Sequence, residues 1–192
     1  MSRTPVTVRA AVVDDLPALR ELWGDILRRG TADEQLADLA RVLDEAGSDP
    51  GQSIVVAEYD GEVAGAIHLS ATTLTPLNLE PAVLAVSPHV LPQFRRHGVG
   101  SALIEAAVRF AEAQGIATIS TAAVASSRDA NRFMARLSFT PQATLRAATT
   151  VAVRAKLSAR RSAGRSATRP AGSRHIDRVL AARRISRENI AG

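Results

Sequence analysis

The residues most suited to chemistry lie in the first part of LPQFRRHGVGSALIEAAVRFAEAQGI, residues 91–116. Two arginines, a histidine and two glycines form a loop there, and a helical pattern follows it. The first amides of a helix lack partners within the helix and carry the positive end of its dipole, so a glycine-rich approach suits a phosphate. Gly98 and Gly100 remove side chains where an anion would sit, and residues 95–97 add positive charge. The loop predicts a phosphate site, although it also fits a tight strand-to-helix turn with solvated arginines.

A helix follows this loop, and a strand follows the helix. The apolar residues recur at the helical period and would face the core: Leu103, Ile104, Ala107, Val108 and Ala111. Gly115 supplies the left-handed residue that commonly ends a helix, and the apolar, β-branched run from Ile116 predicts a strand. The phosphate site would therefore lie at a loop–helix junction that leads into a further strand.

Two blocks of the sequence resemble signatures of one enzyme superfamily. The spacing Arg95-x-x-Gly98-x-Gly100, after a strand-like segment and before a helix, resembles the acyl-CoA signature of the GNAT superfamily of N-acyltransferases. Residues 130–139, with Phe133 and the closing Leu-Ser-Phe, look like the late helix of that family, in the family's order and separation. In the family the first loop wraps the pyrophosphate of coenzyme A, so the resemblance gives this role to residues 95–100.

The resemblance implies acetyl-CoA as cosubstrate and no metal. An amide near the end of the fourth strand points at the thioester carbonyl in the family, and this role maps to the backbone amide of Leu91. The implied cofactor-binding residues are Val90, Leu91, Arg95, Arg96, His97, Gly98, Val99, Gly100, Ser101, Ser127, Asn131 and Phe133. The four histidines of the chain show no metal-ligand spacing.

The proton-handling residues depart from the family pattern. Met134 stands where the family commonly has the tyrosine that protonates the thiolate, and Ser127 replaces an asparagine that contacts pantetheine. A thiol with a pKa of about 8.5 leaves tolerably without an acid. The candidate bases are Glu80, Ser87 and His89. His89 is the candidate catalytic residue because its intrinsic pKa is the most suitable, and the alternative, which we expect, is that a water chain removes the amine proton.

The remaining patterns predict an α/β domain with a mixed, mostly antiparallel central sheet flanked by helices. The expected strands are 6–9, 53–59, 63–70, 82–91, 116–125 and a last pair within 144–157; the expected helices begin near Asp14, Thr31, Gly100 and residue 128. Ile26 and Leu36 would be buried, and Asp60-Gly61 predicts a hairpin. By resemblance, strands four and five splay to form the acyl-CoA cleft, and Pro88 lies at a bulge of strand four.

Composition divides the 192 residues into two regions. Residues 1–145 contain 12 basic and 17 acidic residues, whereas residues 146–192 contain 12 basic and 2 acidic ones. The resemblance implies an acyltransferase domain over 1–157, and the composition predicts a basic, low-complexity arm over 158–192 that is disordered or partly helical. The absence of cysteine excludes a thiol nucleophile and disulfides, and no signal-peptide or membrane-spanning run is found, so we expect a cytoplasmic protein.

The resemblance implies an N-acetyltransferase that moves an acetyl group from acetyl-CoA to a small-molecule or protein amine by direct attack in a ternary complex. One alternative is a non-catalytic acyl-CoA-binding or regulatory domain, which the methionine at the tyrosine position favours. Another is a nucleic-acid-binding module that uses the basic arm for weak, non-specific polyanion binding. Six aromatic residues and the lack of a reading motif count against the last one. A homodimer is left open.

Overall fold

The computed structural model describes residues 5–122, 127–142 and 146–167. Two compact units make up the chain, residues 1–140 and residues 141–192. The first unit contains a five-stranded sheet in the order β1-β2-β3-β4-β5. Its strands are β1 Thr7–Ala10, β2 Gln52–Tyr59, β3 Glu62–Thr73, β4 Pro81–Val90 and β5 Thr118–Thr121. The first four pair antiparallel and β5 joins β4 in parallel, which confirms the predicted mixed, mostly antiparallel sheet.

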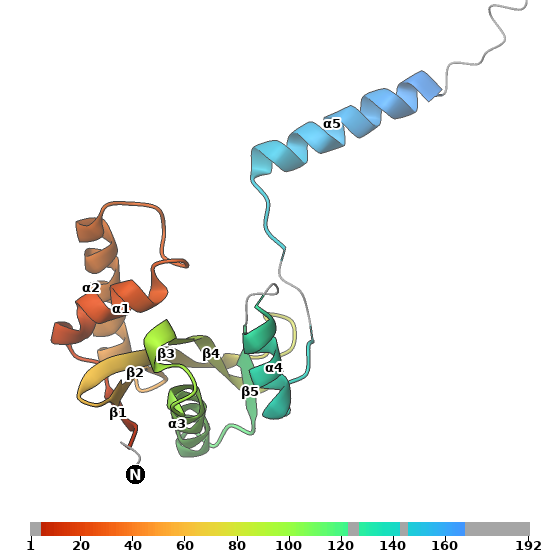
Figure 1. The fold of residues 1–192 in the computed structure, drawn as a ribbon. Helices are drawn as coiled ribbons and strands as arrows, with labels where there is room; N and C mark the ends of the chain where they lie inside the picture. Colours follow the sequence, from red (N-terminus) through yellow and green to blue (C-terminus); the bar gives the residue numbers. More distant parts are fainter. Residues whose placement is uncertain (1–4, 123–126, 143–145, 168–192) are drawn as a thin grey trace, which may run out of the picture. The chain divides into compact units, whose positions relative to one another are not determined.

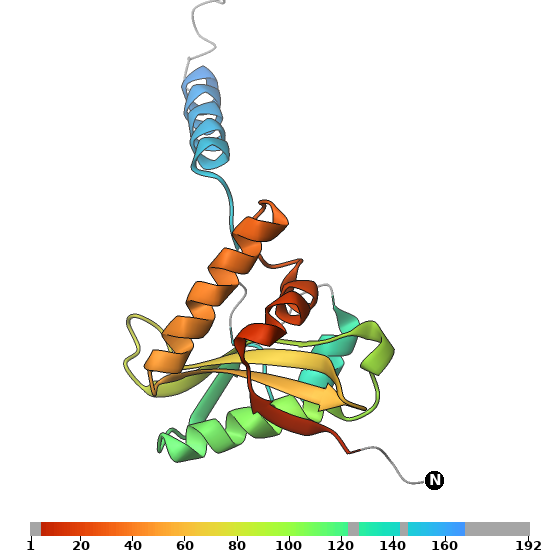
Figure 2. The ribbon, with the colours of Figure 1, turned by 90° about the vertical axis from the view of Figure 1, so that its left-hand side faces the viewer.

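Helices cover both faces of this sheet. They are α1 Leu16–Trp23, α2 Ala32–Ser48, α3 Val99–Ala113 and α4 Arg128–Arg136, with short 3₁₀ helices η1 at Val13–Asp15 and η2 at Pro92–Phe94. Figures 1 and 2 show α1 and α2 on one face and α3 on the opposite face. Met134 of α4 belongs to the same core as α3, so α4 completes that second layer.

Each face has its own apolar core. The α1/α2 core contains Leu19, Leu22, Trp23, Leu39, Ile54, Val56 and Ala66; the α3/α4 core contains Ile67, Leu69, Val83, Leu103, Ile104 and Ala107. The helical stripes predicted from the sequence supply both cores. Ile26 is an exception and is 48% exposed, because α1 ends at Trp23 and Ile26 lies in the following turn. Val108 is likewise 39% exposed.

Local signals position the elements as predicted. Asp60 and Gly61 adopt φ angles of 55° and 80°, the left-handed pair that joins β2 to β3 in a tight hairpin. At the start of α2, Thr31 Oγ1 accepts a hydrogen bond from the Glu34 amide at 3.2 Å. Glu34 Oε2 accepts one from the Thr31 amide at 2.8 Å. This capping box fixes where α2 begins.

Strand β4 carries the predicted bulge beside Pro88. Ala66 pairs with His89 and His68 pairs with Val86, so two steps along β3 match three steps along β4. The extra residue lies between Val86 and His89, where a proline costs no regular ladder bond. Pairing of β4 with β5 covers Ala82–Ala85 and Thr118–Thr121. Among the described residues β4 therefore continues from Val86 to Val90 without β5. Positions 123–125 of the predicted strand 116–125 lie outside the described residues.

The second unit corrects the prediction of a last strand pair. Residues 150–157 form the first half of helix α5, Thr150–Ala167, and residues 144–145 lie outside the described residues. Valines alternating with other residues suggested a strand, but alanine, arginine, lysine and leucine are strong helix formers and dominate the segment. The predicted domain boundary at residue 157 falls inside α5, whereas the first compact unit ends at Thr140.

Candidate active site

The loop between β4 and α3 leads into a helix start at which, among the described residues, no side chain caps the first amides. Arg96 and Gly98 adopt φ angles of 69° and 93°, and this left-handed geometry turns the chain into the helix at Val99. Gly98 is the N-cap residue, and no side chain among the described residues caps the helix. The amides of Val99, Gly100 and Ser101 therefore keep the anion-binding capacity of a helix N-terminus.

Positive charge surrounds these amides. Arg95, Arg96 and His97 are exposed, and in the described part of the chain neither arginine forms an ion pair. The ring of Tyr59, at the end of β2, lies 4.7 Å from the His97 ring and 6.1 Å from the Phe94 ring, centroid to centroid. Tyr59 thus supports the loop from the neighbouring hairpin. This contact leaves no local pattern in the sequence, because Phe94 and His97 lie more than thirty residues from Tyr59.

Three of the predicted binding residues converge where the loop enters α3. A Cβ built on Gly100 would lie 3.4 Å from Phe133 Cζ of α4 and 3.8 Å from Val90 Cγ2 of β4. Gly100 is therefore a point of close approach, and a side chain there would meet the Phe133 ring. The end of β4, the start of α3 and one face of α4 meet at this point.

The Leu91 amide, which was predicted to donate to the thioester carbonyl, already donates a hydrogen bond within the sheet. The Leu91 N–H donates to the Ala64 carbonyl at 2.9 Å, so it points toward β3. Adjacent residues of an antiparallel strand direct their backbone groups to opposite sides. The Val90 amide therefore points away from β3, toward the side where β5 no longer pairs, and Val90 replaces Leu91 as the candidate donor.

Two histidines share the α1/α2 face beside the bulge. His89 pairs with Ala66, and His68 pairs with Ile54 on one side and Val86 on the other. Ala66 and Ile54 both belong to the α1/α2 core, which places the two imidazoles on that face. Burial lowers the pKa of His68, with no contribution from a charged group. In the described residues, His68 Nε2 is buried without a hydrogen-bond partner.

The candidate base Glu80 is not brought to this site. It is exposed and precedes β4, where its Oε1 accepts a weak hydrogen bond from Thr118 Oγ1 at 3.4 Å. The loop and the bulge lie toward the other end of β4, and a strand advances about 3.3 Å per residue. Glu80 therefore lies far from the convergent residues. Nothing is described for the side chain of Ser87, the third candidate.

A family comparison identifies this arrangement. The model of the acetyltransferase (GNAT) family matches residues 16–139, from α1 to the residues just after α4. The chain belongs to the acetyltransferase (GNAT) family. The match includes the whole loop of residues 91–98 and both helices that meet at Gly100.

Individual relatives agree with this family. The chain is 32% identical over 113 residues to phosphinothricin N-acetyltransferase of Alcaligenes faecalis, which covers 54% of each protein, so it spans about half the length of that curated relative. A transcriptional regulator from Bacillus halodurans C-125 has a TM-score of 0.65 at 23% identity, covering 76% of this chain and 100% of its own. The aminoglycoside N-acetyltransferase AAC(6')-Iy in complex with CoA has a TM-score of 0.63 at 20% identity, covering 77% and 95%. These two similarities show the fold.

Helix α4 departs from the GNAT sequence pattern for a structural reason. Ser127 Oγ caps the helix by accepting from the Ala130 amide at 3.4 Å, and Asn131 Nδ2 donates to the Ser127 carbonyl at 2.7 Å. Met134 is 7% exposed and packs in the α3/α4 core. Met134, at the position that commonly holds a tyrosine in GNAT enzymes, is therefore part of the apolar core. The neighbouring Phe133 faces Gly100.

Metal-ion clusters and membrane-spanning helices are both absent from the described residues. Within the residues described, no three histidine, aspartate or glutamate side chains gather as a metal-ion cluster. Over the same residues, no helix is both long enough and apolar enough to cross a membrane.

Proposed function

We propose that this GNAT acetyltransferase moves an acetyl group from acetyl-CoA to an amine by direct attack in a ternary complex. The observation that carries the proposal is the convergence of Val90, Gly100 and Phe133 at the uncapped start of α3. A helix N-terminus flanked by unpaired arginines attracts the pyrophosphate of coenzyme A. The family match over residues 16–139 supports the same assignment.

The coenzyme would extend from the loop along β4. Its pyrophosphate binds the amides of Gly98–Ser101 with Arg95, Arg96 and His97 around it. The pantetheine arm follows the edge of β4 from Val86 to Val90, where pairing with β5 has ended among the described residues. The thioester carbonyl accepts a hydrogen bond from the Val90 amide, which stabilises the negative charge that develops on that oxygen. Ser127 and Asn131 are the polar groups available from α4.

The chemistry needs one nucleophile and one departing thiolate. The neutral amine nitrogen forms a bond to the thioester carbon, and the carbon–sulfur bond then breaks with its electron pair on sulfur. The amine proton passes to water or to His89, which faces the α1/α2 side beside the bulge. The thiolate takes a proton from solvent, since coenzyme A thiol, with a pKa of about 8.5, tolerates departure without an acid.

The acceptor proposed first is a small molecule with a primary amine. The curated relative acts on phosphinothricin according to its name, and this chain matches about half of the relative's length. A panel of amines therefore begins with phosphinothricin, continues through amino acids, polyamines and aminoglycosides, and ends with peptide N-termini and lysines. Release of free coenzyme A thiol, measured with a thiol reagent, identifies the acceptor.

One observation favours a second candidate function. The buried Met134 leaves no acid at the usual position of α4, as in a domain that binds acyl-CoA without turning it over. Such a regulatory domain would bind acetyl-CoA by calorimetry and release no thiol with any amine of the panel. Turnover above the rate of spontaneous hydrolysis excludes it.

The binding site is tested with a charge placed in the first turn of α3. Gly100→Asp puts a carboxylate where the pyrophosphate would lie, and an acid in the first turn of a helix does not destabilise that helix. We expect coenzyme A affinity to fall at least about tenfold, because repulsion replaces attraction in a partly desolvated site. Isothermal titration calorimetry with coenzyme A measures the change.

Two further variants separate charge from packing. Gly100→Ala adds the methyl group that would sit 3.4 Å from Phe133 Cζ, and we expect a smaller loss of affinity than with aspartate. Gly47→Asp adds the same charge at an exposed position of α2 where an added Cβ meets nothing within 4 Å, and affinity should not change. Full affinity in a folded Gly100→Asp protein would place the coenzyme elsewhere.

A further inference from the structure

Helix α5 exposes an unpartnered, basic surface. All its described side chains, from Thr150 to Arg161, are exposed, and Thr149 Oγ1 caps its start by accepting from the Ala152 amide at 3.2 Å. The helix contains five basic residues and no acidic one: Arg154, Lys156, Arg160, Arg161 and Arg165. In the part of the chain that the structure describes, no ion pair involves the first four of these.

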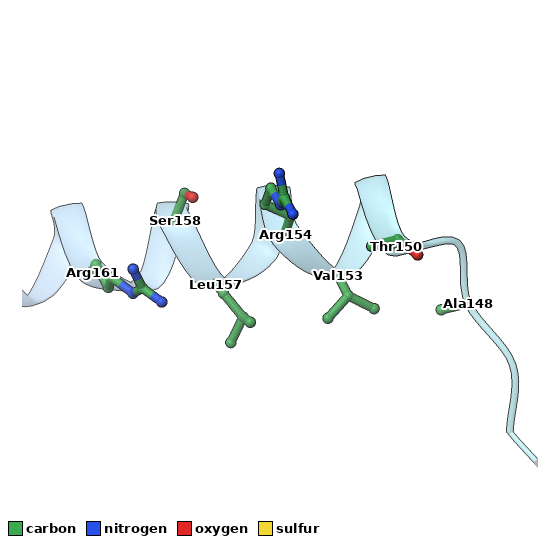
Figure 3. A pocket seen from close by; sticks show the side chains of 7 residues that line it. All are labelled: Ala148, Thr150, Val153, Arg154, Leu157, Ser158 and Arg161. Atoms are coloured by element: carbon green, nitrogen blue, oxygen red, sulfur yellow. The ribbon is translucent and has the colours of Figure 1, made fainter.

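Two of the arginines share one face of α5. Arg154 and Arg161 are seven residues apart, about 20° short of two full turns, so they lie on the same face about 10 Å apart along the axis. Both line one open hollow along α5, together with Ala148, Thr150, Val153, Leu157 and Ser158. Lys156 and Arg160 do not line it and lie about 100–160° around the helix from the two arginines. Figure 3 shows Arg154 and Ser158 projecting to one side, and Val153 and Leu157 to the other.

We propose that α5 binds the phosphate backbone of duplex DNA through the face that presents Arg154 and Arg161. Duplex DNA carries a phosphate about every 3.4 Å along each strand, so two guanidinium groups about 10 Å apart find partners on any sequence. Eleven of the twelve basic residues after residue 145 are arginines, whose planar guanidinium forms paired hydrogen bonds with phosphate oxygens. The binding is non-specific and independent of acetyl transfer.

Other occupants of this face fit less well. A membrane-surface helix needs a broad apolar face, but the large apolar residues of α5 are Val151, Val153 and Leu157, and Val151 lies about 160° around the helix from Val153. Acidic groups of the chain itself are a second option. Five of the 17 acidic residues within residues 1–145 are already engaged, since Asp15, Glu58, Asp38, Glu45 and Glu105 each pair with an arginine of residues 9–109. An external polyanion has charges that are not engaged in this way.

The test uses the full chain and a fluorescent 20-base-pair duplex of random sequence, titrated at several salt concentrations. The first double variant is Arg154→Gln with Arg161→Gln. The matched control is Lys156→Gln with Arg160→Gln, which removes the same charge from the other side of α5. Glutamine keeps helix propensity high, and circular dichroism checks the helix content of both proteins. Vesicles of anionic phospholipid and a duplex RNA serve as competing polyanions.

We expect the wild-type protein to bind DNA with an affinity that falls steeply with salt. Loss of two phosphate contacts should lower affinity on the order of tenfold to a hundredfold near 0.1 M salt and make the log–log salt slope shallower by about 2. The control double variant should lose clearly less affinity and keep its slope. Arg154→Lys with Arg161→Lys keeps the charge and should keep the slope, even if the glutamine variant loses helix.

Three results would overturn the proposal. Equal losses in the two glutamine variants would show that net charge of the arm, and not this face of α5, determines binding. No binding of the wild-type protein to DNA at about 50 mM salt would remove the interaction altogether. Stronger retention on anionic vesicles or on RNA than on DNA would assign the helix to a different polyanion.

Discussion

The Tyr59 ring lies 4.7 Å from the His97 ring, at an interplanar angle of 51°, and ties the end of β2 to the loop that leads into α3. The same tyrosine lies 6.1 Å from Phe94, so one side chain contacts both ends of the turn. Most of the other loop residues are exposed, including Arg96 and Gly98 with their left-handed backbone.

Removal of the Tyr59 ring should therefore weaken coenzyme binding through the loop, because Tyr59 supports the loop and does not contact the coenzyme itself. We expect Tyr59→Ala to raise the dissociation constant of coenzyme A about three- to tenfold, because aromatic pairs contribute about 0.5–1.5 kcal/mol beyond area burial. Tyr59→Phe keeps the ring and should bind like wild type. Calorimetry decides, and a loss in the phenylalanine variant would instead give the hydroxyl group a direct role.

His89 is tested through the pH dependence of acetyl transfer. With the amine identified by the thiol-release panel, we expect His89→Ala to leave the shape of the kcat/KM profile unchanged, because water removes the amine proton. The measurement covers about pH 6 to 9 with folding checked at each end. Loss of an ionisation from the profile, or a hundredfold loss of activity at every pH, would make His89 the base.

His68 should make the protein sensitive to mild acid. Its pKa is lowered in the folded state by burial, so below the ordinary histidine value near 6.5 the unfolded chain binds a proton that the folded chain does not. Stability is therefore lost as the pH falls below that value. Urea unfolding should show that His68→Leu loses less stability than wild type between pH 7 and 5. Both proteins should behave alike between pH 7 and 8, and a parallel acid loss would contradict the assignment.

The ion pair between Arg9 of β1 and Asp15 at the start of α1 should affect stability at a lower pH than His68 does. Arg9 donates from both terminal nitrogens to Asp15, with Nη1–Oδ2 at 2.6 Å and Nη2–Oδ1 at 2.8 Å, and Asp15 is 5% exposed. The Arg9 hydrogen bond lowers the pKa of Asp15. The stability that this carboxylate contributes is thus complete above the ordinary aspartate value near 3.9 and is lost as the pH falls through the lowered pKa.

Arg9→Met leaves the Asp15 carboxylate buried without its cation. We expect a loss of about 2 kcal/mol in unfolding free energy at pH 7, less than for a fully buried pair because the Arg9 side chain is 38% exposed. The loss should shrink at about pH 3, where the carboxylate takes up its proton. Arg41→Met breaks the exposed pair with Glu45 and should cost under about 0.5 kcal/mol. Equal effects of the two variants would contradict the burial argument.

The sequence by itself determined the features that depend on neighbouring residues. Asp60-Gly61 predicted a hairpin because few residue pairs accept two left-handed conformations, and Thr31 with Glu34 predicted a helix start because three residues separate them. The loop at Gly98 and Gly100 and the apolar stripe of α3 are likewise local. The bulge at Pro88 followed from the resemblance together with the missing proline donor.

Only the tertiary structure decided the features that depend on a partner distant in the sequence. The Leu91 amide was the expected donor until the hydrogen bond to Ala64 assigned it to β3, which left the Val90 amide facing the open edge. The contact between Tyr59 and His97 and the packing of Met134 in the α3/α4 core also depend on partners distant in the sequence. Residues 150–157 lie in a helix, since a strand is stabilised by neighbouring strands whereas a helix forms its backbone hydrogen bonds within its own segment. Pairings between distant segments leave no periodic pattern in a single sequence, so the direction of one amide or ring is fixed only when the chain has folded.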